Sequence, residues 1–559
     1  MKLRPYQQEF FSKVRDALDA KCNRQLGVLA TGLGKAILFA TLREQLGFER
    51  KILVLVHREE LAAQAARQLQ HWNPGLMIGV EMADSSAAPM DQLIVGSVPT
   101  LGRRKSSRIL KFHPDEFDVV VSDEAHHISP GSRWANVLEY FGVLRPGESH
   151  ILSLGLTATP NRSDGHALRD FYDLIVFSMG LWEGIESGYL VPLESWLVQS
   201  KSNLDSVHTH AGEFAEDELA DAVNTPERNA AIVREWMKRA YGKRTLAFCV
   251  NIQHSADLAA MFRHYSISAE PIWGVDPERA AKFARHRGGE TTVLTNCQLA
   301  REGYDDRDIE CIILGMPHKA ALPVEQEIGR GTRLPTGIDN LLEAIKNGVR
   351  LSKDRCIILS VQDIATKHEL FDVPTLFGLP TGMDLEGKSV TYAKKKYEQV
   401  AKEYPTADLS QIKSLSKLES VSKSLELFKV NYPPEIARMS EFAWRKSAEG
   451  YMLAFKSDLV TVAQDLRGDW QIRGRIGEHV AEFSAQNLPG AMNLADKFVV
   501  DHGGIKAILS RDRRWHGDPP TEKQLSLCRI LKLVVPANAT KGQVSAAIDA
   551  RRMQQRRGI

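Results

Sequence analysis

Short apolar runs alternate with amphipathic stretches over roughly the first 375 residues of the chain. The clearest runs are 27–31, 52–56, 93–98, 119–122, 151–156, 245–250, 292–295, 311–315 and 356–361. Runs of this length that are rich in Val, Ile and Leu and are bounded by turn residues are typical of strands buried on both faces. Their alternation with helical patterns predicts βαβ units and mostly parallel sheets.

The density of apolar runs falls between about residues 180 and 240, which divides this part of the chain into two α/β domains. We expect the first domain at 1–195 and the second at 225–375, joined by a linker at 196–224. The glycine-rich turn before Lys35 precedes a helical pattern over Ile37–Leu46.

The pattern changes after about residue 378, where long apolar runs become rare. A basic, helical linker is expected at 376–435, because Leu415, Leu418, Val421, Leu425 and Phe428 recur at spacings of three and four and share one helix face. An accessory α+β domain with a helical tail is expected at 436–559.

Two capping-box patterns support the helical tail. Thr521 with Gln524, and Thr540 with Gln543, have the spacing at which side chains satisfy free N–H groups of a first helical turn. We therefore expect two short helices near the end of the chain.

Composition excludes several classes of protein. The 559 residues are 43% hydrophobic and 25% charged, as in ordinary globular proteins. The sequence contains no run of about 18 apolar residues, so no transmembrane helix is predicted. The first twenty residues also lack the apolar centre of a signal peptide. The six scattered cysteines contain no CxxC pair, which favours a reducing compartment over a disulfide framework. A cytoplasmic location and no membrane partner are the resulting expectations.

The formal net charge of +2 conceals an uneven distribution. Residues 381–559 contain 29 Lys+Arg against 21 Asp+Glu, whereas the rest of the chain contains 43 against 49. The basic C-terminal part includes the clusters 394–396, 511–514 and 551–557, which favour phosphate contacts. Trp444, Trp470 and Trp515 are not enriched there, so an accessory nucleic-acid grip and a partner-docking module remain equally favoured.

A glycine-rich turn, Thr31-Gly32-Leu33-Gly34-Lys35-Ala36, connects the first apolar run to a helical pattern. Backbone N–H groups of such a turn can surround phosphate oxygens, and Lys35 can place a charge at the terminal phosphates. The strict P-loop pattern fails at both ends, because Leu29 replaces its first glycine and Ala36 replaces its Ser or Thr. A plain strand–helix connection is the alternative.

Two carboxylates, Asp123 and Glu124, follow the apolar run 119–122. Ligands of open α/β sheets bind at the carboxyl ends of the strands. Asp123 is suited to hold Mg²⁺ through water, and Glu124 to orient and deprotonate an attacking water. The alternative is an acidic N-cap pair on the next helix.

A third candidate is the segment Gln326-Glu327-Ile328-Gly329-Arg330-Gly331-Thr332-Arg333. Arginines three apart in a helical stretch share a face and can reach one anion, as an arginine finger does in phosphoryl transfer. A solvated basic helix is the alternative interpretation.

The ordered set LRPYQ (3–7), TGLGK (31–35), DEAH (123–126), TATP (157–160), REGYD (301–305) and QEIGRGTR (326–333) resembles the superfamily 2 helicases. The sequence is most similar to the DEAH-box branch that includes XPB-like helicases and the translocase subunits of restriction enzymes. This resemblance covers about the first two thirds of the chain. It implies two tandem RecA-like domains that bind ATP and Mg²⁺ between them, followed by the C-terminal helical and α+β accessory region.

The resemblance also implies roles for single residues. Gln7 would read adenine with Arg4 and Tyr6 nearby, Thr31 to Ala36 would form the phosphate cradle, and Asp123 and Glu124 would keep the roles given above. Gly303 and Asp305 would contact the nucleotide from the second domain, and Gln326, Arg330 and Arg333 would close the cleft. His126, Thr157 and Thr159 would couple the nucleotide state to nucleic-acid binding. Arg58, Ser97 and Thr100 would contact the nucleic-acid backbone.

The function expected from this resemblance is an ATP-dependent helicase or translocase that acts on nucleic acid, DNA in preference to RNA. Ala36 departs from the family pattern, because the usual hydroxyl at this position is a direct Mg²⁺ ligand. Two alternatives therefore stay open: a nucleotide-gated clamp with weak hydrolysis, and a motor subunit of a restriction or defence complex. The C-terminal region could also bind protein partners.

Overall fold

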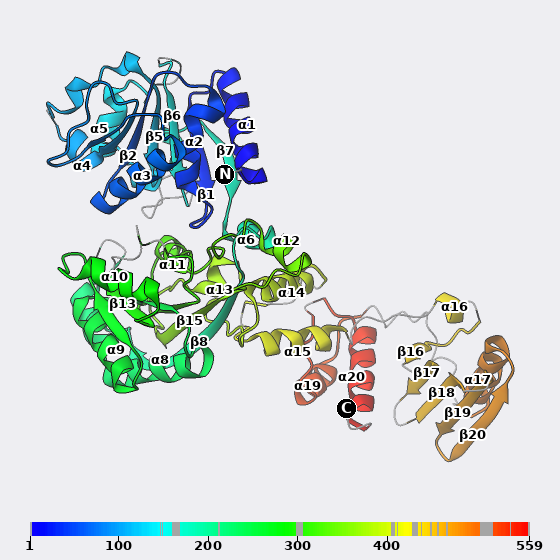
Figure 1. Cartoon of the computed structure of the whole chain (residues 1–559). Helices are drawn as coiled ribbons and strands as arrows, with labels where there is room; N and C mark the ends of the chain where they lie inside the picture. The colour runs from blue at the N-terminus through cyan, green and yellow to red at the C-terminus, as the bar shows by residue number, and fades with distance from the viewer. Residues whose placement is uncertain are drawn as a thin grey trace. The chain divides into compact units, whose positions relative to one another are not determined.

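The computed structural model describes most of the chain. The described residues are 3–104, 106–145, 147, 149–158, 168–210, 213–297, 304, 306–403, 409–410, 412–426, 434–437, 439–447, 450–455, 458–465, 468–502, 518–536 and 538–556. They form two compact units, Met1–Lys394 and Lys395–Ile559. Each unit is described separately below, with the element labels of Figure 1.

The first unit contains two parallel sheets. The first sheet has seven strands in the order β3-β4-β2-β5-β6-β1-β7, and each neighbouring pair is parallel. Its strands are β1 (Arg24–Leu29), β2 (Lys51–Val56), β3 (Ile78–Glu81), β4 (Leu93–Ser97), β5 (Phe117–Asp123), β6 (Leu152–Thr157) and β7 (Leu174–Met179).

Helices between these strands supply crossovers of the kind that parallel pairing requires. They are α2 (Lys35–Leu46), α3 (Glu59–Trp72), α4 (Val98–Leu101) and α5 (Arg133–Tyr140), with short 3₁₀ turns at Ile109–Lys111, Pro114–Glu116, Ala125–His127 and Leu168–Asp170. Helix α1 (Pro5–Asp19) precedes β1, and α6 (Leu181–Glu186) follows β7. The central strands β1 and β6 are buried along their whole length, as the continuous apolar runs predicted.

The second sheet has six strands in the order β12-β13-β11-β14-β15-β8, and all neighbours are again parallel. Its strands are β8 (Leu193–Asn203), β11 (Thr245–Cys249), β12 (Ala269–Ile272), β13 (Val293–Cys297), β14 (Cys311–Leu314) and β15 (Cys356–Ile364). The helices of this part are α7 (Glu216–Val223), α8 (Pro226–Arg239), α9 (Ile252–His264), α10 (Arg279–Gly288), α11 (Ala321–Ile328), α12 (Leu341–Lys346) and α13 (Val373–Leu376). Helix α14 (Val390–Glu403) contains the boundary between the two units, which follows Lys394.

The range 196–224 contains more regular structure than a linker. Most of β8 lies in this range, and five of the eight positions at which β8 pairs with β15 fall within it. The two-stranded ribbon of β9 (Thr209–His210) and β10 (Glu213–Phe214) follows, and then α7. The exposure of β8 alternates along much of the strand, because it lies at the edge of the second sheet. Such a strand lacks the continuous apolar run of a central strand.

The second unit is built around a five-stranded antiparallel meander with α17 (Leu488–His502) packed on it. Its strands are β16 (Arg445–Ser447), β17 (Gly450–Phe455), β18 (Asp458–Gln464), β19 (Trp470–Ile476) and β20 (His479–Ala485). The other helices are α15 (Leu415–Glu426), α16 (Pro434–Ala437), α19 (Glu522–Ile530) and α20 (Lys541–Arg556). This arrangement confirms a helical and α+β accessory region.

Several local predictions for this unit are confirmed. Leu415, Leu418 and Leu425 are buried on α15, whereas Phe428 lies outside the described residues. Both capping boxes are formed: the backbone N–H groups of Gln524 and Gln543 donate to Thr521 Oγ1 and Thr540 Oγ1 at 3.3 and 3.4 Å.

The two described tryptophans of this unit belong to its core or pack against it. Trp444 is fully buried, and its Nε1 donates to Asp496 Oδ1 at 2.8 Å. Trp470 packs against Tyr451 with 6.1 Å between ring centroids. Trp515 and the basic cluster 511–514 lie outside the described residues. Among the described helices of the whole chain, none is long and apolar enough to cross a membrane.

Candidate active site

A pocket in the first unit is lined by residues that follow strands of both sheets. From the first sheet's side come the glycine-rich turn, the DEAH segment, α1 and α3, and from the second come residues after β13 and α11. The lining residues are Arg4, Tyr6, Gln7, Thr31, Gly32, Gly34, Lys35, Ala36, Ile37, Phe39, Leu61, Gln64, Ala65, Gln68, Trp72, Asp123, Glu124, Arg307, Arg330, Arg333, Leu334 and Asp339.

The turn between β1 and α2 has the backbone of a phosphate-binding loop. Gly32 and Gly34 have φ values of +95° and +77°, in the left-handed region that favours glycine. Lys35 is the first residue of α2, so the turn opens directly into a helix N-terminus. Ala36 also lines the pocket and brings no hydroxyl to it.

Helix α1 holds this turn in place. The buried Tyr6 hydroxyl donates to the carbonyl of Leu33 at 2.6 Å. The side chain of Gln7 is also buried, and its Oε1 accepts the backbone N–H of Arg4 at 3.0 Å. Gln7, the predicted adenine-reading residue, therefore lines the same pocket as the glycine-rich turn, and its neighbours Arg4 and Tyr6 line it too.

Asp123 and Glu124 lie at the carboxyl end of β5, opposite Lys35. Lys35 Nζ lies 3.3 Å from Glu124 Oε1, and both side chains are largely buried. Burial and the negative charge of Glu124 raise the pKa of Asp123, while Lys35 acts to lower it. A carboxylate whose ionisation is opposed by burial and by an adjacent carboxylate is a group that a divalent cation stabilises. Asp123 therefore fits Mg²⁺.

A polar chain runs from Glu124 to the end of β6. His126 Nδ1 lies 3.3 Å from Glu124 Oε2 and 3.2 Å from Thr157 Oγ1. Both His126 and Thr157 are buried. Thr157 is the last residue of β6, so a change in the backbone there can reach the candidate catalytic carboxylate through one imidazole ring.

The two arginines converge, but the predicted helix does not carry them. Helix α11 ends at Ile328, and Arg330 and Arg333 lie in the turn and the irregular segment beyond it, so a shared helical face does not explain their proximity. A common acceptor brings them together instead: Arg330 Nη1 and Arg333 Nη1 donate to the carbonyl of Tyr304 at 3.2 and 3.5 Å.

The end of α11 lies directly against the glycine-rich turn. A Cβ added at Gly329 would lie 2.5 Å from Thr31 Cβ, a distance that only glycine permits. Glu325, one turn earlier on α11, has a pKa raised to about 7 by burial; the charge of Lys35 lowers it and that of Glu124 raises it. Backbone packing thus brings residues of the second sheet up to the phosphate-binding turn.

Some predicted residues do not line this pocket. Gln326 is buried on α11 and is absent from the described lining. Thr159, Gly303 and Asp305 lie outside the described residues. Arg58, Ser97 and Thr100 lie outside this pocket, near the carboxyl ends of β2 and β4. These strands are parallel neighbours in which Val56 pairs with Ser97.

Other lining residues were not predicted. Arg307 and Asp339 come from the second sheet's side, and Gln64, Gln68 and Trp72 lie on α3. The spacing of the α3 residues is that of one helix face, which was a usable signal. Arg307 follows REGYD closely, but a single arginine in a charged segment does not stand out.

Comparison with known proteins supports the assignment of class. The family "Type III restriction enzyme, res subunit" matches residues 1–162, and the family "Mitochondrial helicase Irc3, C-terminal domain" matches residues 418–558.

Two curated yeast proteins resemble the chain. The "Putative mitochondrial ATP-dependent helicase irc3" of Schizosaccharomyces pombe is 28% identical over 95% of this chain and 86% of its own length. The "Putative ATP-dependent helicase IRC3" of Saccharomyces cerevisiae is 32% identical over 67% of this chain and 54% of its own length.

Restriction enzymes also match. A "Type I restriction enzyme EcoAI endonuclease subunit" of Escherichia coli is 23% identical over 73% of this chain and 52% of its own length. Among solved structures, a fragment of a putative HsdR subunit of a type I restriction enzyme from Vibrio vulnificus has a TM-score of 0.47, with 19% identity over 65% of this chain and 68% of that chain.

The two parallel sheets, with the candidate nucleotide pocket between them, define a protein with tandem RecA-like domains. These matches with known proteins support a likeness to superfamily 2 helicases and restriction translocases, and the ATP-dependent helicases named among the relatives indicate an ATP-hydrolysing, helicase-type enzyme.

The expectation of a cytoplasmic location is wrong. The relative that matches 95% of the chain is named a mitochondrial helicase, and so is the family that matches its C-terminal part. Cysteine usage distinguishes reducing from oxidising compartments, and it cannot tell one reducing compartment from another.

Proposed function

We propose that this enzyme hydrolyses ATP in the pocket between the two RecA-like domains and uses the cycle to move along a strand of DNA. One observation carries the proposal: Lys35, Glu124 and Arg330 line a single pocket although they come from three distant segments and two sheets. This combination supplies a phosphate cradle, a base and a cation from the opposite domain, which are the parts that phosphoryl transfer requires.

The geometry supports a division of roles among these residues. Lys35 and the N–H groups of the Gly32–Gly34 turn are suited to bind the terminal phosphates. Glu124, held between Lys35 and His126 at 3.3 Å from each, is suited to orient a water and accept its proton. Arg330 and Arg333 would neutralise charge on the transferred phosphoryl group from the opposite side.

Mg²⁺ would be held through Asp123, where it would neutralise charge on the phosphates. Ala36 offers no oxygen, so we propose that water completes the coordination at that position. Glu325 adds a further partly buried carboxyl whose ionisation responds to Lys35 and Glu124. We also propose that the chain belongs to the DEAH-box branch, and its DEAH segment at 123–126 supports this.

Coupling to nucleic acid would pass through the chain Glu124–His126–Thr157. Arg58, Ser97 and Thr100 are suited to contact the backbone of the strand, because they follow β2 and β4 at the same edge of the first sheet. Roles for Thr159, Gly303, Asp305 and Gln326 stay predictions. The likeness to a restriction endonuclease subunit supports DNA as the polymer.

The experiment is ATP hydrolysis by the full chain with no polymer, single-stranded DNA, duplex DNA or RNA. Stimulation by DNA above RNA is expected. Turnover that no polymer changes would refute the proposed coupling, and stronger stimulation by RNA would refute the preference for DNA. Glu124→Gln should abolish turnover and keep ATP binding, since the amide retains the shape of the side chain but cannot accept the proton. Retained turnover in this variant would refute the role of Glu124.

A further inference from the structure

A second pocket of the first unit lies between the two sheets and contains an aromatic side chain that the proposed ATP cycle does not use. Arg58 lines it from the first sheet's side, and Asn251, Gln253, Trp273 and Gly274 line it from the second's. Trp273 directly follows β12, at the carboxyl end of the strand, and its ring is partly exposed. Nothing lies within 4 Å of a Cβ added at Gly274, so the approach to the ring is open on that side.

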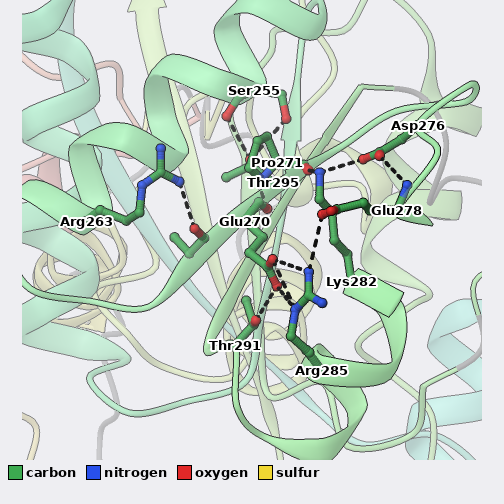
Figure 2. A network of polar contacts seen from close by, with 11 residues as sticks. Ser255, Arg263, Glu270, Pro271, Asp276, Glu278, Lys282, Arg285, Thr291 and Thr295 are labelled. Carbon is green, nitrogen blue, oxygen red and sulfur yellow. Dashed lines mark hydrogen bonds and ion pairs between the residues drawn. The ribbon is translucent and has the colours of Figure 1, made fainter. Parts of the chain in front are cut away.

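The segment that carries Trp273 is held in place by a buried lysine (Figure 2). Lys282 of α10 is 9% exposed, and its Nζ donates to the carbonyl of Pro271 at 3.0 Å and to Asp276 Oδ2 at 2.7 Å. The same Nζ lies 4.8 Å from the centroid of the Trp273 ring, a cation–π contact. Residues on both sides of Trp273 are therefore tied to one ammonium group, which also contacts the ring.

A second set of bonds fixes α10 to the base of β12. Arg285 donates to both carboxylate oxygens of Glu270, with Nη2 at 2.6 Å from Oε1, and the Thr291 hydroxyl donates to Glu270 Oε2 at 2.5 Å. The pKa of Glu270 is lowered, chiefly by its hydrogen bonds from Arg285, so its carboxylate stays charged. The ring is thus presented by a segment that needs little ordering when a ligand binds.

We propose that Trp273 stacks on a base of single-stranded nucleic acid, with the adjacent phosphates held on the Arg58 side of the pocket. Among the described residues that line this pocket, Arg58 is the one basic residue, and the acidic residues Glu216 and Asp217 come from α7. This distribution of charge draws a phosphate backbone toward the first sheet and leaves the bases to face the ring. Stacking accepts any base, which suits a protein that must pass along varied sequence.

This inference rests on the proposed function, because it assumes that a strand occupies this pocket. Its test is the binding of a fluorescent oligonucleotide to the full chain, measured by anisotropy with oligo-dT, oligo-rU and an oligonucleotide of abasic sites. Trp273→Ala should weaken binding of the two normal oligonucleotides roughly 5- to 150-fold, the range for loss of one stacked base. Trp273→Phe keeps an aromatic face and should restore most of the affinity.

Two controls separate stacking from disruption of the fold. Val275→Ala removes the side chain of a residue two positions away that is 88% exposed and does not line the pocket, so binding should not change. The abasic oligonucleotide has phosphates but no bases, so wild type and Trp273→Ala should bind it equally.

The outcomes distinguish the two levels of the argument. Equal affinity of wild type and Trp273→Ala for oligo-dT and oligo-rU would overturn the inference and leave the proposed function intact. An equal loss on the abasic oligonucleotide would also overturn it, because the ring would then be acting on the backbone or on the fold. A wild-type chain that binds none of the three would refute the proposed function itself.

Discussion

A methyl group at Gly329 is the sharpest perturbation of the ATP site that the structure offers. Gly329 has φ −60° and ψ −19°, backbone angles that alanine also adopts. An added Cβ would nevertheless lie 2.5 Å from Thr31 Cβ, whereas carbon atoms in favourable contact are about 3.5–4.0 Å apart. In Gly329→Ala, the end of α11 must therefore move away from the glycine-rich turn by about 1 Å or more.

This displacement acts on the arginines and not on the folding of either domain. Arg330 is the next residue, so it moves with α11, and a misplacement of about 1 Å can cost roughly 100-fold in rate. That factor corresponds to about 2.7 kcal/mol of transition-state stabilisation. Replacement of glycine by alanine in an allowed helical conformation contributes about 0.4–1 kcal/mol to stability through the unfolded state. Activity should therefore fall while stability changes little.

The assay is steady-state ATP hydrolysis with saturating single-stranded DNA, together with thermal unfolding of the same samples. For Gly329→Ala we expect kcat to fall about 10- to 100-fold and Tm to stay within a few degrees. Gly75→Ala is the matched control, because an added Cβ at Gly75 meets no atom within 4 Å. Wild-type kcat in Gly329→Ala would refute the claim that the arginines act only when α11 lies against the turn.

Three further predictions test other parts of the account. Ala36→Thr restores a hydroxyl beside Lys35 and should raise ATPase activity or its apparent Mg²⁺ affinity; identical kinetics over a Mg²⁺ titration would contradict this. Thr157→Val removes the hydroxyl 3.2 Å from His126 and should lower the stimulation of hydrolysis by DNA about 5-fold, with basal hydrolysis largely kept; an unchanged ratio would exclude this route of coupling. Burial lowers the pKa of Lys353 to about 8, below the usual lysine value near 10.4. Between these two pH values the unfolded chain binds more protons at Lys353 than the folded chain does. The contribution of Lys353 to the free energy of unfolding therefore increases as pH rises. Urea unfolding of wild type and Lys353→Met should show that the wild type gains stability relative to the variant from pH 8 to 10, and a constant difference would refute the assignment.

The sequence predicted the centres of both parallel sheets better than their edges. The nine apolar runs coincide with central strands, for which burial on both faces requires continuous apolar sequence. The four strands absent from that set, β3, β7, β8 and β12, are the edges of the two sheets. Polar residues interrupt β3, β8 and β12, whereas β7 begins with the apolar run 174–177, so sequence alone could have located it.

The candidate site was predictable where its chemistry lies in a short segment. Glu124 directly follows β5, and Lys35 follows β1 after the short glycine-rich turn, so their meeting at the carboxyl ends of the strands follows from parallel topology. Contacts that depend on tertiary packing had no such signal. Arg330 and Arg333 meet through the carbonyl of Tyr304, and Trp273 owes its orientation to a lysine nine residues later. Sequence spacing does not encode these arrangements.

The same distinction applies to the C-terminal unit. A basic segment with three tryptophans left nucleic-acid binding and partner docking equally favoured. The structure buries Trp444 completely and packs Trp470 against Tyr451, so these two rings stabilise the α+β core. These two tryptophans therefore give no information about a ligand of this unit, because their rings pack in its core.

Movement along a strand is the central claim, and the dependence of arrival time on length tests it most directly. The full chain is bound to single-stranded DNA of increasing length that carries a fluorophore at one end, and ATP is added by rapid mixing. The account predicts a lag before the fluorescence change that grows in proportion to the length of the strand and disappears in Glu124→Gln. A wild-type chain that hydrolyses ATP on this DNA with a lag independent of length would contradict it.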